Sequence, residues 1–126
     1  MSQCKRAVTG AALAVALTAS GFVPSAAADD LIQVNGTHWS DASTLEKQAY
    51  LIGMANMIQA ERAYRRETAP DAPASLSDRT AQGIDDVSID TVRERIDAWY
   101  AANPAQLATP VLGVIWIDMV KPELDQ

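Results

Sequence analysis

The sequence predicts an all-α fold, a small single-domain bundle of three main helices plus one or two short ones, with an apolar C-terminal helix at its centre. Three observations lead to this fold class. Helix-capping residues precede segments in which apolar side chains recur at spacings of three and four. Segment 111–117, VLGVIWI, carries no charge and lies between prolines. The one cysteine, Cys4, is near the N-terminus, so a core rather than disulfides must stabilise the domain.

Residues 1–28 are predicted to be a signal peptide. Two basic residues precede a long apolar stretch, and the alanines at 26–28 give the small-residue pattern that signal peptidase accepts. Cleavage is expected between Ala28 and Asp29. A retained N-terminal membrane helix is the alternative, but the apolar stretch is short for a span and ends in a cleavage motif. The protein is therefore expected to be periplasmic or secreted, without membrane insertion after cleavage.

The charge of the mature chain narrows the class of partner. Residues 1–28 hold two of the ten basic residues and none of the 16 acidic ones, so cleavage leaves 98 residues with a net charge of −8. This charge argues against nucleic acid, which is bound by neutralising phosphates with Lys and Arg. It also argues against an anionic membrane surface. The negative charge fits a basic protein partner, or it serves solubility alone, which is the simpler interpretation. Another protein is the expected partner.

The mature chain is expected to begin with an irregular arm. Residues 29–42 form this arm, with a turn at Asn35-Gly36 and with Trp39 docked on the core.

The helical domain then spans 43–126. Its first helix starts at a capping box, S-T-L-E from Ser43, and runs to about Glu67. Apolar residues at helical spacing widen into a broad face, so this helix is expected to be buried on more than one side over its first half. The members of that face are Tyr50, Leu51, Met54, Ala55, Met57, Ile58 and Tyr64.

The middle of the domain is expected to be a loop over 68–82, because Pro70 and Pro73 stop a helix. Ser77 is expected to cap at most a single turn within it. A second helix then begins at the cap Ser88 and shows apolar residues on one face up to Tyr100. A short turn follows over 104–107.

The last helix is expected to run from Pro110 to about Lys121, where Pro122 stops it. A buried strand is the alternative, since Val, Ile and Trp favour strands, but no convincing partner strand exists except 31–34. A helix that is apolar nearly all round must be covered all round. It should therefore be central, wrapped by the helices that begin at Ser43 and Ser88. Asp118 is expected at its edge, in water or paired with an arginine.

The candidate partner-binding surface combines the 68–82 loop with the polar end of the first helix. A basic cluster there could meet an acidic partner, although matching the helix dipole is the simpler role for it. The residues proposed for this surface are Arg62, Arg65, Arg66, Asp71, Asp78 and Arg79.

The sequence offers little material for catalysis or for a cofactor. His38 is the only histidine, so no cluster of His and Cys can hold a metal, and neither a metal nor a cofactor is predicted. Asp85, Asp86 and Asp90 lack the Gly and Glu spacing of a calcium loop. No serine has the setting of a nucleophile elbow, and no glycine-rich loop could hold a phosphate. The chain is thus expected not to be an enzyme.

Part of the sequence resembles a known group of exported proteins. The residues that carry the likeness are Gly83-Ile84, Val87-Ser88, Val92, Ile96, Trp99-Tyr100, Asn103-Pro104, Leu107 and Pro110, with Trp39, Ser43, Tyr50 and Gly53 upstream. The residues from Gly83 to Pro110 resemble the C-terminal half of small exported proteobacterial proteins of the type VI secretion amidase-immunity (Tai-like) family. The upstream residues resemble the first helix of related periplasmic proteins. The resemblance implies a periplasmic helical inhibitor that binds a cell-wall amidase directly. Members of that family carry cysteines suited to disulfides, whereas the chain after residue 28 has none.

Three functional hypotheses follow. The first is an exported, non-enzymatic protein that binds another protein, as an immunity-type inhibitor does. The second is an acid-stress periplasmic chaperone, a class of small helical protein that the chain also resembles. The third and least favoured is a small hydrolase that uses Asp118 or Asp85.

Overall fold

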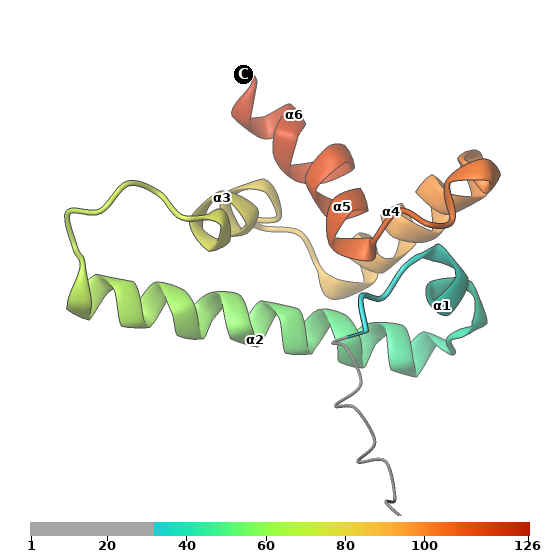
Figure 1. Cartoon of the computed structure of the whole chain (residues 1–126), viewed down its shortest axis with the longest axis horizontal. Coiled ribbons are helices and arrows are strands. Elements are labelled where there is room, and N and C mark those ends of the chain that lie inside the picture. The colour runs from blue at the N-terminus through green and yellow to red at the C-terminus, as the bar shows by residue number, and fades with distance from the viewer. Residues whose placement is uncertain (1–31) are drawn as a thin grey trace, which may run out of the picture. The chain divides into compact units, whose positions relative to one another are not determined.

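The computed structural model describes residues 32–126 and confirms the all-α class for them (Figure 1). The expected signal peptide and its cleavage site, Ala28–Asp29, lie outside these residues. Four α-helices come first in the described part: α1 (Gly36–Asp41), α2 (Thr44–Thr68), α3 (Leu76–Gly83) and α4 (Ile89–Ala102). A 3-10 turn, η1 (Pro104–Gln106), follows them. The C-terminal helix consists of α5 (Val111–Ile115), a π-helical segment η2 (Trp116–Val120) and α6 (Lys121–Leu124).

The predicted caps begin two of the main helices. The Ser43 hydroxyl accepts from the Glu46 backbone N–H, and the Glu46 carboxylate accepts from the Ser43 N–H at 2.8 Å. Ser88 caps α4 by accepting from the Thr91 N–H at 3.1 Å. Each cap satisfies backbone donors that the first helical turn leaves free.

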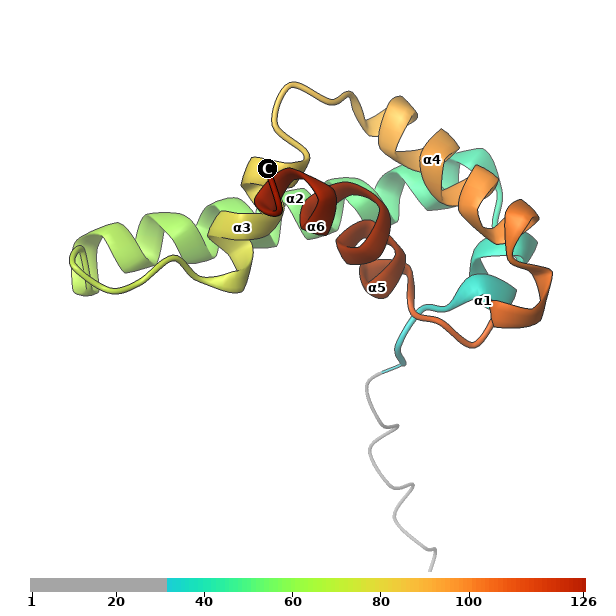
Figure 2. The ribbon, with the colours of Figure 1, turned by 90° about the horizontal axis from the view of Figure 1, so that it is seen from above.

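The C-terminal helix holds the core together, as predicted. Of the ten apolar residues that are buried within 32–126, it provides five, namely Val111, Val114, Ile115, Met119 and Val120. The others are Trp39, Leu51, Val92, Ile96 and Tyr100. The expectation that this helix is covered all round is wrong, because Leu112 and Ile117 are each 50% exposed. Its cover comes from α4 and α3, and α3 lies where a loop was expected (Figure 2).

Two segments expected to be irregular are helical instead. Within the expected arm, Gly36–Asp41 is helix α1, and Asn35 caps it rather than forming a turn. Within the expected 68–82 loop, Leu76–Gly83 is helix α3, and its cap is Ser75 rather than Ser77. In both cases a capping box closes the first turn, which stabilises a helix too short to form alone.

Pro122 does not stop the C-terminal helix, which continues to Leu124. A proline lacks an N–H and clashes with the carbonyl four residues before it, here that of Asp118. The helix widens at this place, where the Lys121 N–H donates to the Trp116 carbonyl, five residues back. The freed Asp118 carbonyl accepts from Arg95 at 2.6 Å, and the Asp118 carboxylate pairs with the same guanidinium at 2.9 Å. Asp118 is thus an arginine-paired edge residue, as predicted.

Helix α1 is fixed to the core by Trp39, whose docking was predicted and is confirmed by an exposure of 2%. Its indole Nε1 donates to Asp97 of α4 at 2.7 Å, and Lys47 of α2 donates to the same oxygen at 2.9 Å. Arg93 completes the cluster at 3.1 Å from the other oxygen. One carboxylate therefore joins three helices.

Candidate functional site

The predicted basic cluster mainly attaches α3 and the preceding loop to α2. The Arg62 Nε lies 3.1 Å from the Asp78 carboxylate, and Arg65 lies 3.4 Å from Glu61. Arg65 also donates to the Pro73 carbonyl at 2.6 Å. Hydrogen bonds from the backbone and side chain of Ser75 lower the pKa of Asp78, with burial opposing and Arg62 assisting. These three predicted binding residues therefore have structural partners within the domain.

The other three predicted residues do not form one surface with them. Arg66, Asp71 and Arg79 are exposed and have no ion pair among residues 32–126. Arg66 shares a cleft of about 470 Å³ with Arg62 and Asp85, and the residues lining that cleft do not include Asp71 or Arg79. The structure thus separates the expected surface into an internal ion-pair network and scattered exposed charges.

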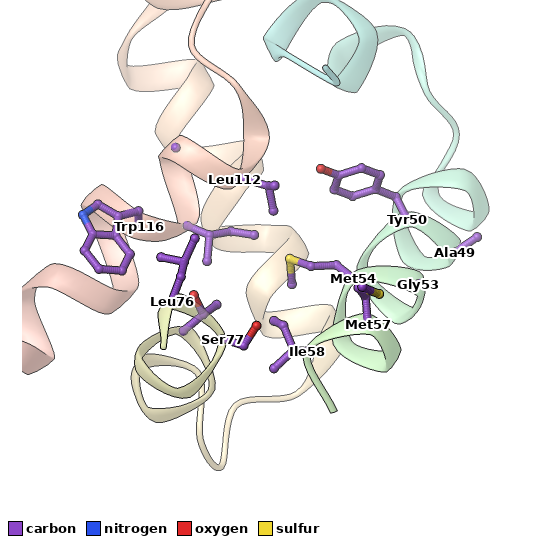
Figure 3. Close-up of a pocket in the computed structure, with 13 residues that line it drawn as sticks. Ala49, Tyr50, Gly53, Met54, Met57, Ile58, Leu76, Ser77, Leu112 and Trp116 are labelled. Carbon is purple, nitrogen blue, oxygen red and sulfur yellow. The ribbon is translucent and has the colours of Figure 1, made fainter. Parts of the chain in front are cut away.

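A larger apolar groove lies beside α2, between α3 and α5 (Figure 3). Its volume is about 740 Å³. The residues lining it are Ala49, Tyr50, Gly53, Met54, Met57 and Ile58 of α2, Leu76, Ser77 and Thr80 of α3, and Leu112, Gly113, Ile115 and Trp116 of the C-terminal helix. None of them carries a charge. A concave apolar surface with few polar groups is the usual form of a binding site in proteins.

The rim of this groove exposes large apolar side chains. Met57 and Leu76 are each 69% exposed, and Leu112 is 50% exposed. Figure 3 shows Leu112 and Tyr50 on opposite sides of one end of the groove, with Leu76 on the wall opposite α2 and Trp116 beyond Leu76 on the same side. Single exposed apolar residues are common on protein surfaces, but a contiguous patch of them marks an interaction site.

Helix α2 forms one wall of the groove because an uncharged part of it projects beyond the core. From Gln48 to Ala60 the helix has no charged residue, yet Leu51 is its only buried one. The expectation that its first half is buried on more than one side is therefore wrong. The apolar face of α2 is wider than the part of it that packs on the core, and Met57 and Tyr64 on this face are strongly exposed.

Tyr50 connects the groove to the core. Its ring packs edge-on against Trp39, with ring centroids 6.2 Å apart. Burial raises the pKa of its hydroxyl, which stays neutral at ordinary pH. Neither this hydroxyl nor the Trp116 indole N–H has a hydrogen-bond partner among the described residues, so both can serve a ligand.

The remaining candidates for chemistry have structural roles. His38 Nδ1 accepts from the Asn35 N–H at 3.3 Å and thereby closes the capping box of α1. Residues 32–126 contain no group of three or more His, Cys, Asp or Glu side chains that could hold a metal ion. No helix in the same part of the chain is long and apolar enough to cross a membrane.

Sequence reasoning missed the groove, although a signal for it was present. A surface helix needs one apolar stripe, and α2 carries more apolar surface than one stripe requires. That excess can mean burial on several sides or an exposed binding face, and only the position of α3 decides between them.

In comparisons with known proteins, no family model, no curated protein and no solved structure matches this chain.

Proposed function

We propose that this chain is an exported, non-enzymatic protein that acts by binding another protein, and that the apolar groove between α2, α3 and α5 receives the apolar face of a partner helix. The observation that carries the proposal is the groove itself, an uncharged concave surface rimmed by Met57, Leu76 and Leu112. An amphipathic helix that lies in an apolar groove is a recurring mode of recognition.

The dimensions of the groove suit a short helical segment. Along α2 it extends from Ala49 to Ile58, which at the rise of an α-helix is about 14 Å. A partner helix places apolar anchors at positions i, i+3 or i+4, and i+7. Such anchors span about 10 Å. The uncharged lining favours anchors without charge, because a buried unpaired charge is costly.

Export and a narrower role are supported by the sequence alone. The leader over residues 1–28 favours a periplasmic or secreted protein. The resemblance to amidase-immunity proteins favours an inhibitor whose partner is a cell-wall amidase. If so, the groove is the inhibitory surface, rather than the 68–82 segment.

A photo-crosslinking experiment in the source organism tests the groove. A crosslinking amino acid at Met57, on the rim, should capture one predominant protein, whereas the same group at Asp71, in the exposed loop, should not. Leu112→Glu should reduce capture through position 57 by about tenfold or more, because it places an unpaired charge on an uncharged surface that the partner must cover. Ile117→Glu is the matched control, because Ile117 is also 50% exposed but does not line the groove.

The outcome that contradicts the groove assignment is equally specific. If the crosslinker at position 71 captures more protein than the crosslinker at position 57, the binding surface lies in the loop and not in the groove. Equal capture by the Leu112→Glu and Ile117→Glu variants would show that the captured protein does not depend on the groove.

One observation favours the acid-stress chaperone as a second candidate. Burial tends to raise the pKa of Asp97, but hydrogen bonds from Lys47 and Trp39 and the charges of Lys47 and Arg93 outweigh it and lower that pKa. A lowered carboxylate pKa gives stability that is present above the ordinary value for Asp and is lost as pH falls through the folded-state pKa. Acid below about pH 4 should therefore weaken the contact of α1 and α2 with α4.

Thermal unfolding of wild type and Asp97→Asn at several pH values measures this contribution. The variant should melt at a lower temperature at pH 7, and its melting temperature should fall less than that of wild type between pH 5 and pH 2. Parallel pH dependence in the two proteins would rule out Asp97 as an acid-sensitive contact. A chaperone also requires apolar dye binding and protection of client proteins at low pH, and failure of both would remove this candidate.

A further inference from the structure

The groove has a lining chemistry that selects among the side chains a partner can insert. We infer that the partner's central anchor is an aromatic side chain, which enters the groove over Gly53, beside Met54 and Met57. The inference rests on the proposed binding function and adds the chemical identity of the anchor.

The first support is the absence of a charged group in the lining. Residues that dominate the binding energy of interfaces are most often Trp, Tyr and Arg. An arginine anchor needs a carboxylate or another acceptor that can satisfy its guanidinium. No carboxylate lines this groove, so the aromatic side chains remain.

The second support is the presence of sulfur atoms and an aromatic ring. Met54 and Met57 bring two thioethers into the groove, and sulfur makes favourable contacts with aromatic rings at about 5 Å. Tyr50 adds a ring on the α2 side of the groove, which suits edge-to-face or offset packing against a second ring (Figure 3). Methionine side chains are also flexible and can adjust to the shape of the ring that enters.

The third support is open space at the position of a helix glycine. A Cβ added to Gly53 would have no heavy atom within 4 Å, apart from its neighbours in α2. Glycine inside a helix costs about 0.5–1 kcal/mol relative to alanine. No close approach within the domain requires Gly53, and the space beside it is open to a side chain that enters the groove.

Methionine methyl NMR on residues 29–126 tests the inference with indole as the probe. Of the four methionines in the sequence, Met1 lies in the leader, Met54 and Met57 line the groove, and Met119 is 1% exposed. Indole should shift the Met54 and Met57 methyl signals through its ring current and leave Met119 unchanged. Cyclohexanol should bind more weakly than indole and, as the decisive comparison, about tenfold more weakly than phenol, its aromatic counterpart with the same ring size and one hydroxyl.

Gly53→Leu should weaken indole binding by about tenfold or more, because the added side chain occupies the space over position 53. Ala60→Leu is the matched control: it adds a leucine seven residues further along α2, at an exposed position outside the groove. Both variants should melt cooperatively, which separates loss of binding from loss of fold.

Two results overturn the inference. One is equal binding of cyclohexanol and phenol, and the other is no shift of Met54 and Met57 at millimolar indole. If either result is obtained while the crosslinking experiment still captures a groove-dependent protein, only the aromatic anchor is wrong, and the protein-binding function stands. If indole binds as expected but no groove-dependent protein is captured, the anchor site stands and the proposed protein-binding function fails.

Discussion

Ile115→Asp should unfold the domain. Ile115 is 1% exposed and lies in α5. It is one of the residues that the C-terminal helix contributes to the core. Burying an isolated carboxylate costs several kcal/mol, and losing the isoleucine removes about 2–3 kcal/mol of apolar burial. A domain of this size has a total stability of about 5–15 kcal/mol, so the native state should no longer be the populated one at 25 °C.

Ile117→Asp provides the comparison, because it places the same charge two residues further along at a side chain that is 50% exposed. It should keep the far-ultraviolet circular dichroism and the cooperative melting of wild type. The neighbouring residue Trp116 differs from Ile115 in its surroundings. Trp116 is only partly buried and lines the groove, so its replacement should affect binding more than folding. Ile115→Asp melting within a few degrees of wild type would contradict the central position of the C-terminal helix.

Gly83→Ala should destabilise the domain by about 1–3 kcal/mol, the usual cost of overpacking a tight contact. Gly83 is the last residue of α3 and is buried against the C-terminal helix. A Cβ there would lie 2.5 Å from the Cα of Val120 and 2.9 Å from its Cγ2. The nearest atom belongs to the backbone, so α3 or the C-terminal helix must move, and one wall of the groove moves with it.

Gly53→Ala is the matched substitution and should have the opposite sign. With no atom near its Cβ, the added methyl group should stabilise α2 by about 0.5–1 kcal/mol. Urea unfolding of the two variants beside wild type measures both effects. Equal stability of Gly83→Ala and wild type would mean that α3 does not pack on the C-terminal helix as described.

The elements that could be predicted from the sequence are those with a strong local signal. Ser43 and Ser88 each precede a long amphipathic segment, so cap and periodicity agree, and the structure places both helices accordingly. Pro104 likewise begins a short turn, and Pro110 directly precedes the C-terminal helix. Helices α1 and α3 have only six and eight residues, too few for a periodic apolar pattern. Their caps at Asn35 and Ser75 become decisive only because Trp39 and Gly83 dock on the rest of the domain.

The helix beyond Pro122 shows the same limit. From sequence a proline marks a probable helix end, because it removes a hydrogen bond. Here Arg95, distant in sequence, donates to the carbonyl that Pro122 leaves free, and the π-helical turn accommodates the ring. Neither compensation is visible in the local sequence.

The candidate site was the least predictable part. The arginine cluster was conspicuous in sequence, but ion pairs such as Arg62–Asp78 turn inward to support α3. The apolar excess of Gln48 to Ala60 was also visible, but it resembled a deeply buried helix. A groove depends on how far α3 and α5 stand from α2, a tertiary distance that no single segment encodes.

The most direct test of the groove is an NMR titration of residues 29–126 with the protein captured by crosslinking. The binding account predicts shifts of the Met54 and Met57 methyl signals and of the backbone amides of Leu76 and Leu112. Met119 and the loop amides around Asp71 should stay in place. Shifts confined to the loop and to Arg66 and Arg79, with the groove methionines unchanged, would contradict binding in the groove. They would show that the partner binds the charged residues instead.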